Sequence, residues 1–458
     1  MTQYAVTNPA TGRTEAEYPT ATDDQVQDAL AAADKAFAIL GSLSADERAV
    51  LLHRVADLHT ERRDELAAII TREMGKPISQ SLGEVDIVIS IYRYYAENGP
   101  GFLAEDVLNP TAGGSAVVRK EGLGALLGIM PWNYPYYQVA RFAAPNLMIG
   151  NTILLKPAPQ CPESALAMEA IFRDAGLPDG AYVTLLATND QIADAIADSR
   201  VAGVSLTGSE RAGAAVAELA GRHLKKVVLE LGGSDPFVVL DADGAGMEDL
   251  VERAVNARLG NAGQACNAAK RFVILEEVYD DFVDKFTTAL AATKPGDPTN
   301  PATVLGPLSS HAAAATLQGQ LDSAVDNGAT VLLSGGRAAE DSAYFRPAVL
   351  ADVTPDMAVY YQELFGPVAT VFRARSEVEA VAIANDTPFG LGASVHSGDV
   401  ERAARVAAQI TAGMVSINEA GGSAAELPFG GVKRSGVGRE LGRYGMEEFV
   451  NRKLIRIR

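Results

Sequence analysis

From Gly128 onward, the sequence alternates short apolar runs with stretches of helical periodicity. Strands that alternate with helices in this way are typical of parallel sheets covered by helices on both faces. A first series ends near Leu240 and a second runs from about Met247 to Asn418, which predicts two α/β lobes with a cleft between them. In the first series we expect strands at residues 152–155, 182–186, 203–206, 227–229 and 237–240, and helices at 162–175, 190–197 and 210–219.

The second series has its clearest predicted strands at residues 272–275, 331–333, 368–372 and 414–417. Ahead of both series, the periodicity predicts helices over residues 22–40, 44–74 and 80–95. Two strand-like segments, 116–127 and 453–458, fit neither lobe. The terminal strand needs a pairing partner, which is either another subunit or a strand of its own chain.

Composition argues against several classes of function. The 458 residues carry 39 basic and 58 acidic side chains, a net charge of −19, so we expect no nucleic-acid partner. No apolar stretch approaches the roughly 20 residues that span a bilayer, and the first residues lack a signal-peptide pattern, so we expect no membrane location. Only two cysteines occur, Cys161 and Cys266, which fits a reducing cytoplasm; we expect no metal site.

Three residues occur in settings that suit acyl chemistry. Cys266 ends a small, polar, glycine-containing loop, where a substrate can reach a thiol; the alternative is a small buried apolar residue. Glu230 follows a strand-like run, and a partly buried Glu at a strand end has a raised pKa and serves as a general base, unless it forms a structural salt bridge. Asn133, between two prolines, offers an amide N–H to an oxyanion, or else the segment is only a rigid turn.

Two glycine-containing segments bear on dinucleotide binding. Residues 122–128 contain three glycines but are strand-like and open no helix, so we do not assign them this role. Residues 207–213 follow a predicted strand and open a predicted helix, whose N-terminal amides would hold a pyrophosphate.

Together these motifs resemble the aldehyde dehydrogenase superfamily over essentially the whole chain. The matching stretches are residues 131–135, 156–158, 206–213, 229–233, 263–266, 363–367 and 428–436. The resemblance implies an α/β fold with a Rossmann-type cofactor domain, an α/β catalytic domain and a small β oligomerisation arm. The implied boundaries are 1–103 and 123–232 for the dinucleotide-binding domain, 233–436 for the catalytic domain, and 104–122 and 437–458 for the arm. A homodimer or homotetramer is the implied assembly.

The resemblance also implies how the chemistry proceeds. Cys266 is then the nucleophile that attacks an aldehyde to give a thiohemiacetal, and the Asn133 side chain and the Cys266 backbone N–H hold the oxyanion. After hydride transfer to NAD or NADP, Glu230 activates the water that hydrolyses the thioester to a carboxylic acid.

The implied cofactor contacts cover the whole dinucleotide. They are Lys156 at the adenosine ribose, Gly208 and Ser209 at the pyrophosphate, Trp132 and Glu363 at the nicotinamide ribose, and Phe365 beside the nicotinamide. Many NAD-preferring relatives carry Glu three residues after the ribose lysine, where this chain has Pro159. The choice between NAD and NADP therefore stays open.

For the substrate, residues 138–145, 231–237 and 268–272 are similar to short bacterial succinate-semialdehyde dehydrogenases. This resemblance implies that Arg141 and Ser423 hold the far carboxylate of succinate semialdehyde, a task that suits a guanidinium fork. Alternatively, Arg141 forms a salt bridge on a helix surface and the substrate is another short aliphatic or aromatic aldehyde. A cofactor-independent cysteine hydrolase is a further alternative, although none of the five histidines lies in a motif that resembles a Cys-paired base.

Overall fold

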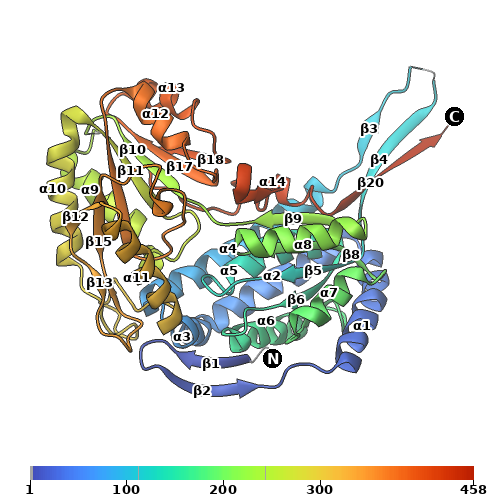
Figure 1. The fold of residues 1–458 in the computed structure, drawn as a ribbon. Helices are drawn as coiled ribbons and strands as arrows, with labels where there is room; N and C mark the ends of the chain where they lie inside the picture. The colour runs from blue at the N-terminus through green and yellow to red at the C-terminus, as the bar shows by residue number, and fades with distance from the viewer. Residues whose placement is uncertain (1–3, 112, 243, 458) are drawn as a thin grey trace.

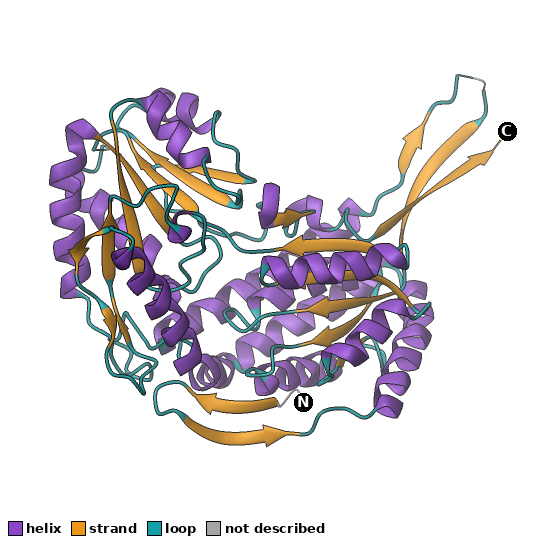
Figure 2. Ribbon diagram, viewed as in Figure 1, coloured by secondary structure: helices purple, strands orange, loops and turns teal. Residues whose placement is uncertain are grey.

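The computed structural model describes residues 4–111, 113–242 and 244–457. Two α/β lobes lie side by side, each built around its own sheet with helices on both faces, and a narrow β-sheet projects away from them (Figures 1 and 2). The predicted two-lobe architecture is therefore confirmed. The strand predicted at residues 237–240 in the first series is misplaced, because Asp235–Val239 pairs with residues 269–274 and 394–396 in the sheet of the second lobe.

The first lobe contains a six-stranded sheet in the order β19-β9-β8-β5-β6-β7. Every pairing is parallel except that of β19 with β9. Strand order reverses at β5, which pairs with β6 on one side and β8 on the other, and open α/β sheets bind ligands at such a switch point, beyond the carboxyl ends of the strands. The strands are β5 (Ala125–Ile129), β6 (Thr152–Lys156), β7 (Tyr182–Thr184), β8 (Val201–Thr207), β9 (Lys226–Glu230) and β19 (Gly436–Val437).

The helices of this lobe depart from prediction at two places. The helix predicted over residues 44–74 is two helices, because the backbone leaves helical geometry at Arg62, where φ is −106° and ψ is 15°. The helix predicted over 80–95 is longer and includes Pro100. The helices are α1 (Asp23–Ser42), α2 (Ala45–Glu61), α3 (Arg63–Met74), α4 (Ile78–Phe102), α5 (Tyr137–Ile149), α6 (Pro162–Asp174), α7 (Asn189–Ala197) and α8 (Glu210–Arg222), and a hairpin of β1 (Tyr4–Asn8) and β2 (Arg13–Tyr18) precedes them.

The second lobe is built on a seven-stranded sheet in the order β12-β15-β16-β11-β10-β17-β18. Its central strands are apolar and buried, with one hydrophobic cluster on each face. The strands are β10 (Asp235–Val239), β11 (Ala269–Leu275), β12 (Thr330–Leu333), β15 (Ala348–Ala351), β16 (Val368–Ala374), β17 (Gly392–His396) and β18 (Met414–Ile417). The helices are α9 (Met247–Leu259), α10 (Glu276–Ala292), α11 (His311–Asp326), α12 (Glu377–Asn385) and α13 (Val400–Ala407), and a short α14 (Gly442–Gly445) follows the lobe.

The projecting sheet consists of β3 (Asp106–Leu108), β4 (Ser115–Gly122) and β20 (Val450–Ile457), all antiparallel (Figure 1). The prediction of one strand over residues 116–127 is therefore wrong. Its first part lies in β4, and its last residues belong to β5 in the centre of the first lobe. Gly124, with φ of 142°, makes the break between them. The terminal strand finds its partner, β4, within the same chain. No helix among the described residues is long and apolar enough to cross a membrane.

Candidate active site

Three strands of the first lobe deliver predicted site residues to one place. The loop after β5 carries Trp132 and Asn133, the turn after β8 carries Gly208 and Ser209, and β9 ends at Glu230. The second lobe adds residues from the opposite side. Together they enclose a cavity of about 240 Å³, which we call the strand-end cavity, and the predicted residues that line it are Trp132, Asn133, Gly208, Ser209, Glu230, Cys266, Glu363 and Phe365.

Lys156 is the predicted cofactor residue that does not line this cavity. It is the last residue of β6, next to β5 in the sheet, and its side chain is largely buried, with Nζ 6.0 Å from the centre of the Tyr4 ring. Burial lowers the pKa of the ammonium group.

The loop that carries Cys266 has an unusual backbone. After α9 ends, Asn261, Ala262 and Gly263 have φ values of 52°, 55° and 76°, so the chain makes a tight left-handed turn before the cysteine. Cys266 is half-buried as a residue and lines two cavities. Burial raises its pKa to about 12, against the opposite effect of the cations Arg141 and Lys270. A thiolate here depends on those two cations.

Asn133 is held beside this loop by both ends of its side chain. Its Nδ2 donates to the Gln264 carbonyl at 2.9 Å, and its Oδ1 accepts from Gln138 Nε2 at 2.9 Å. Asn261 Nδ2 donates to the Asn133 carbonyl at 2.9 Å. An amide nitrogen carries two N–H groups, so one remains for an oxyanion formed at the thiol.

Glu230 is buried, and both carboxylate oxygens lack a hydrogen-bond partner among the described residues. Its close surroundings include Gly430, where a Cβ atom would lie 2.5 Å from Oε1. Burial raises the pKa of Glu230 well above its usual range; Glu440 adds to this rise, and Arg141 opposes it. A carboxyl group in this setting is suited to accept a proton from water.

The other end of the strand-end cavity offers groups for a dinucleotide. Ser209 caps the N-terminus of α8, and the Thr207 hydroxyl is buried in the cavity wall with no hydrogen-bond partner in the described part of the chain. Glu363 Oε1 accepts from the Gly233 N–H at 3.2 Å. The rings of Trp132 and Phe365 meet edge to face, 5.7 Å apart. Helix amides, an unpaired hydroxyl and a carboxylate fit the pyrophosphate and ribose of a nicotinamide cofactor.

On the other side of Cys266 lies a second cavity of about 400 Å³, which we call the tyrosine cavity because Tyr134 and Tyr137 line it. Arg141 lies in its wall, fully buried, with the guanidinium carbon 4.9 Å from the centre of the Tyr137 ring and 4.1 Å from that of Phe429.

The Arg141 guanidinium is ion-paired on one side only. Its Nε lies 2.8 Å from Oε2 of Glu440, an ion-pair contact without hydrogen-bond geometry, and neither Nε nor Nη2, both buried, has a hydrogen-bond partner among the described residues. The salt bridge offered as an alternative role is thus present, but in the interior and not on a helix surface. Ser423 also lines the tyrosine cavity, and its hydroxyl is hydrogen-bonded to that of Tyr137.

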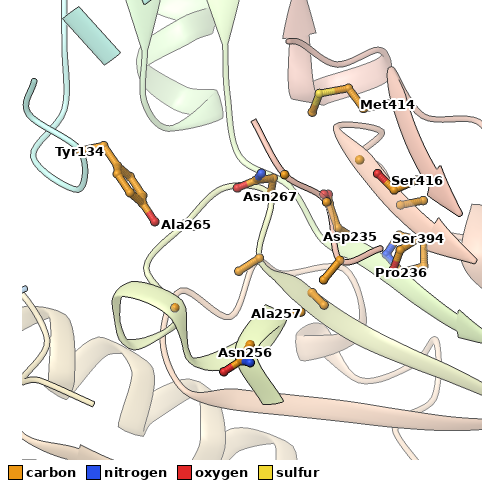
Figure 3. A pocket seen from close by; sticks show the side chains of 18 residues that line it. Tyr134, Asp235, Pro236, Asn256, Ala257, Ala265, Asn267, Ser394, Met414 and Ser416 are labelled. Atoms are coloured by element: carbon orange, nitrogen blue, oxygen red, sulfur yellow. The ribbon is translucent and has the colours of Figure 1, made fainter. Parts of the chain in front are cut away.

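A third cavity, of about 290 Å³, adjoins the tyrosine cavity (Figure 3). Tyr134 and Asn267 line both of them. In Figure 3, Asn267 lies between Tyr134 and Asp235. The residue that follows the cysteine therefore stands where the two cavities meet.

Sequence reasoning missed three buried residues of the site. Gln264 holds Asn133 through its carbonyl, Lys270 contacts the cysteine loop, and Glu440 pairs with Arg141. Two adjacent cations at the start of an otherwise apolar strand were a usable signal for Lys270. Glu440 comes from a loop with no pattern of its own, so only the folded structure reveals it.

Comparison with known proteins identifies the family. The family model described as "Aldehyde dehydrogenase family" matches residues 1–455. The chain belongs to the aldehyde dehydrogenase family. It is 53% identical to a succinate-semialdehyde dehydrogenase [NADP(+)] of Deinococcus radiodurans, over 99% of this chain and 94% of the relative.

Other relatives agree over their full lengths. The chain is 43% identical to succinate-semialdehyde dehydrogenase [NADP(+)] 1 of Mycobacterium tuberculosis, over 98% of this chain and 99% of the relative. The crystal structure of succinic semialdehyde dehydrogenase from Streptococcus pyogenes in complex with NADP+ superposes with a TM-score of 0.96 at 41% identity, covering 99% of each chain. The aldehyde dehydrogenase described here therefore oxidises an aldehyde to a carboxylic acid, and its predicted α/β fold is confirmed.

Proposed function

We propose that this aldehyde dehydrogenase oxidises succinate semialdehyde to succinate, with NADP+ as the hydride acceptor. The observation that carries the substrate assignment is the buried guanidinium of Arg141 in the tyrosine cavity, which Cys266 also lines. Its Nη2 has no hydrogen-bond partner among the described residues, and a buried donor without a partner costs about 1–3 kcal/mol. A substrate carboxylate at this position accepts from that donor. The names of the relatives support the same assignment.

In the proposed reaction, Cys266 attacks the aldehyde carbon and forms a C–S bond. The oxyanion accepts hydrogen bonds from the free N–H of the Asn133 amide and from the Cys266 backbone N–H. When bound, the nicotinamide supplies the hydride acceptor. Glu230 then takes a proton from water, the water oxygen bonds to the thioester carbon, and the C–S bond breaks to release the acid and the thiol.

The far end of the substrate is proposed to lie between Arg141 and Ser423. The rings of Tyr137 and Phe429 hold the guanidinium plane in place, so little side-chain entropy is lost when a carboxylate binds. The Ser423 hydroxyl adds a second, neutral donor beside the Tyr137 hydroxyl.

For the cofactor, we assign Gly208 and Ser209 to the pyrophosphate and Lys156 to the adenosine ribose. We assign Trp132 and Glu363 to the nicotinamide ribose and Phe365 to the nicotinamide face. Pro159 supports NADP because it places no carboxylate near the ribose, where a carboxylate would repel a 2′-phosphate. The relatives named as NADP(+) enzymes support the same choice.

We also infer a homo-oligomer, a dimer or tetramer, that uses the projecting sheet of β3, β4 and β20. Val107, Leu454 and Ile457 are exposed on this sheet, and apolar side chains on an extended, thin element favour burial against another subunit. The two free thiols support a reducing, cytoplasmic environment. Sedimentation of the purified protein tests the assembly: a monomer at micromolar concentration would overturn it.

A screen of aldehydes against NAD+ and NADP+ tests the proposed substrate and cofactor. We expect the highest kcat/KM for succinate semialdehyde with NADP+. A preference for butanal or benzaldehyde over succinate semialdehyde would overturn the substrate assignment, and a preference for NAD+ would overturn the cofactor assignment. Neither result would affect membership of the aldehyde dehydrogenase family.

A further inference from the structure

Strand β11 is buried along its whole length, yet two cations, Lys270 and Arg271, stand near its start. Their side chains contact different segments of the chain. Arg271 donates to the carbonyls of Tyr360 at 3.0 Å and Ile383 at 2.9 Å, away from the cysteine loop. Lys270 turns toward the cysteine loop, and its side chain is only 1% exposed. The placement of a fully buried ammonium group against this loop calls for an explanation.

The ammonium group of Lys270 is directed at the backbone around the nucleophile. Its Nζ donates to the carbonyls of Ala265 at 3.0 Å, Cys266 at 2.8 Å and Ala268 at 3.2 Å. A lysine has three N–H donors, so these carbonyls engage all of them. Nζ also lies 3.3 Å from Oε1 of Glu363, which lines the strand-end cavity. One buried charge therefore contacts the cysteine loop and the proposed ribose-binding carboxylate at once.

We propose that Lys270 is a positioning residue of the reaction, which fixes the cysteine loop, stabilises the Cys266 thiolate and couples the loop to Glu363. The inference rests on the roles proposed above for Cys266 and Glu363. The new element is that Lys270, which does not line the strand-end cavity, positions both the nucleophile Cys266 and the carboxylate of Glu363 proposed to bind the cofactor.

Electrostatics explains why a cation is needed at this place. The charged groups that face the Cys266 thiol are Arg141 from α5 and Lys270 from β11, which favour the thiolate, and Glu363 from the loop before β16 and Asp235 from β10, which oppose it. Tyr134 and Tyr137 face it as well, and burial keeps their hydroxyls protonated. Because two acids oppose two cations, removing Lys270 leaves the balance against the thiolate.

The test compares Lys270→Met with Arg271→Met. Each variant removes one buried cation from the same strand, but only the first cation contacts the cysteine loop. The readout is the rate at which iodoacetamide alkylates Cys266 across a pH series, with the modified residue located by mass spectrometry. The charge of Lys270 lowers the pKa of the Cys266 thiol, and one pKa unit changes the thiolate fraction tenfold, so we expect Lys270→Met to slow alkylation about tenfold at neutral pH. Arg271→Met should keep the wild-type profile.

Two further variants keep the test decisive if Lys270→Met folds poorly. Lys270→Gln keeps two N–H donors without the charge and should show the same shift of the alkylation profile to higher pH. Lys270→Arg keeps the charge and should restore much of the profile. NADP+ titration by fluorescence should show about 2- to 10-fold weaker binding in Lys270→Gln, because the ion pair that orients Glu363 is lost.

Lys270 would be only a structural residue if all its variants lower the melting temperature but leave the alkylation profile and NADP+ affinity unchanged. Failure of the proposed function gives a different result: Cys266→Ser would keep aldehyde oxidation, or alkylation of Cys266 would leave activity intact. The two failures are therefore distinguishable.

Discussion

Replacement of Arg141 by Met is the perturbation that best separates substrate recognition from catalysis. The substitution keeps the apolar contacts with the Tyr137 and Phe429 rings and removes the guanidinium. A charge-assisted hydrogen bond is worth about 1.5–3 kcal/mol, which corresponds to about 10- to 150-fold in kcat/KM. We expect a loss of this size for succinate semialdehyde.

An uncharged aldehyde of the same length, such as butanal, calibrates the result. It has no group for Nη2, but the charge of Arg141 also lowers the pKa of Glu230. The butanal reaction should therefore change modestly and mainly in kcat, because the proposed base loses a neighbouring cation. For succinate semialdehyde, KM should rise as well.

The double variant Arg141→Met/Glu440→Gln provides the matched control, since removing one partner of a buried pair leaves the other charge uncompensated. Steady-state kinetics of both substrates, with melting temperatures, completes the assay. If kcat/KM falls by the same factor for both aldehydes in the single and the double variant, Arg141 does not recognise the carboxylate.

Three further results are expected. Glu230→Gln should release one equivalent of NADPH per active site and then stall, because the thioester lacks its base; loss of the burst itself, seen by stopped-flow absorbance, would place Glu230 before hydride transfer. Since Glu230 must be ionised to act and Glu440 raises its pKa, Glu440→Gln should move the rising limb of the kcat–pH profile to lower pH; an unchanged limb would mean that the carboxyls are not coupled. Burial lowers the pKa of His59 to about 4. Between about pH 6.5 and pH 4, His59 is therefore protonated in the unfolded chain but not in the folded chain. The free energy of unfolding should fall by about 3 kcal/mol as the pH decreases through this range. The urea midpoint of wild type should fall more steeply with decreasing pH than that of His59→Leu; an equal pH dependence of both would contradict this.

Periodicity predicted two α/β series because many of their strands are short, apolar and separated by helices, but it assigned 237–240 to the first series, whereas β10 belongs to the second sheet, and it did not name β15 or β17. It was insufficient where a polar stretch separates two elements of one type, because polar residues also fit the exposed face of a single element. Residues 59–65 are all polar and surround the break at Arg62, yet 44–74 was predicted as one helix. Residues 119–122 are polar or glycine and precede the break at Gly124, yet 116–127 was predicted as one strand, although its two parts belong to different sheets.

The candidate site was predictable where a residue follows a strand directly. Glu230 ends β9, and Asn133 follows β5 at the switch point, so chain order alone places them at the carboxyl edge of the sheet. The roles of these residues remain predictions. Partners from distant segments were not predictable, because Glu440 reaches Arg141 from across 299 positions only through the backbone pairing of Phe429 with Glu440.

The charges around the Cys266 thiol indicate that substrate specificity comes from the hydrogen-bond donor of Arg141 and not from a net positive charge of the site. Arg141 is paired with Glu440, Lys270 with Glu363, and Lys76, in the wall of the tyrosine cavity, with Glu84. Each of these three cations therefore already has a carboxylate beside it, in keeping with the net charge of −19. Nη2 of Arg141, which is not in the ion-pair contact with Glu440, has no hydrogen-bond partner in the part of the chain that the structure describes. A substrate that reaches it gains a hydrogen bond without displacing an acid, so recognition depends on the length and acceptor geometry of the aldehyde more than on long-range attraction.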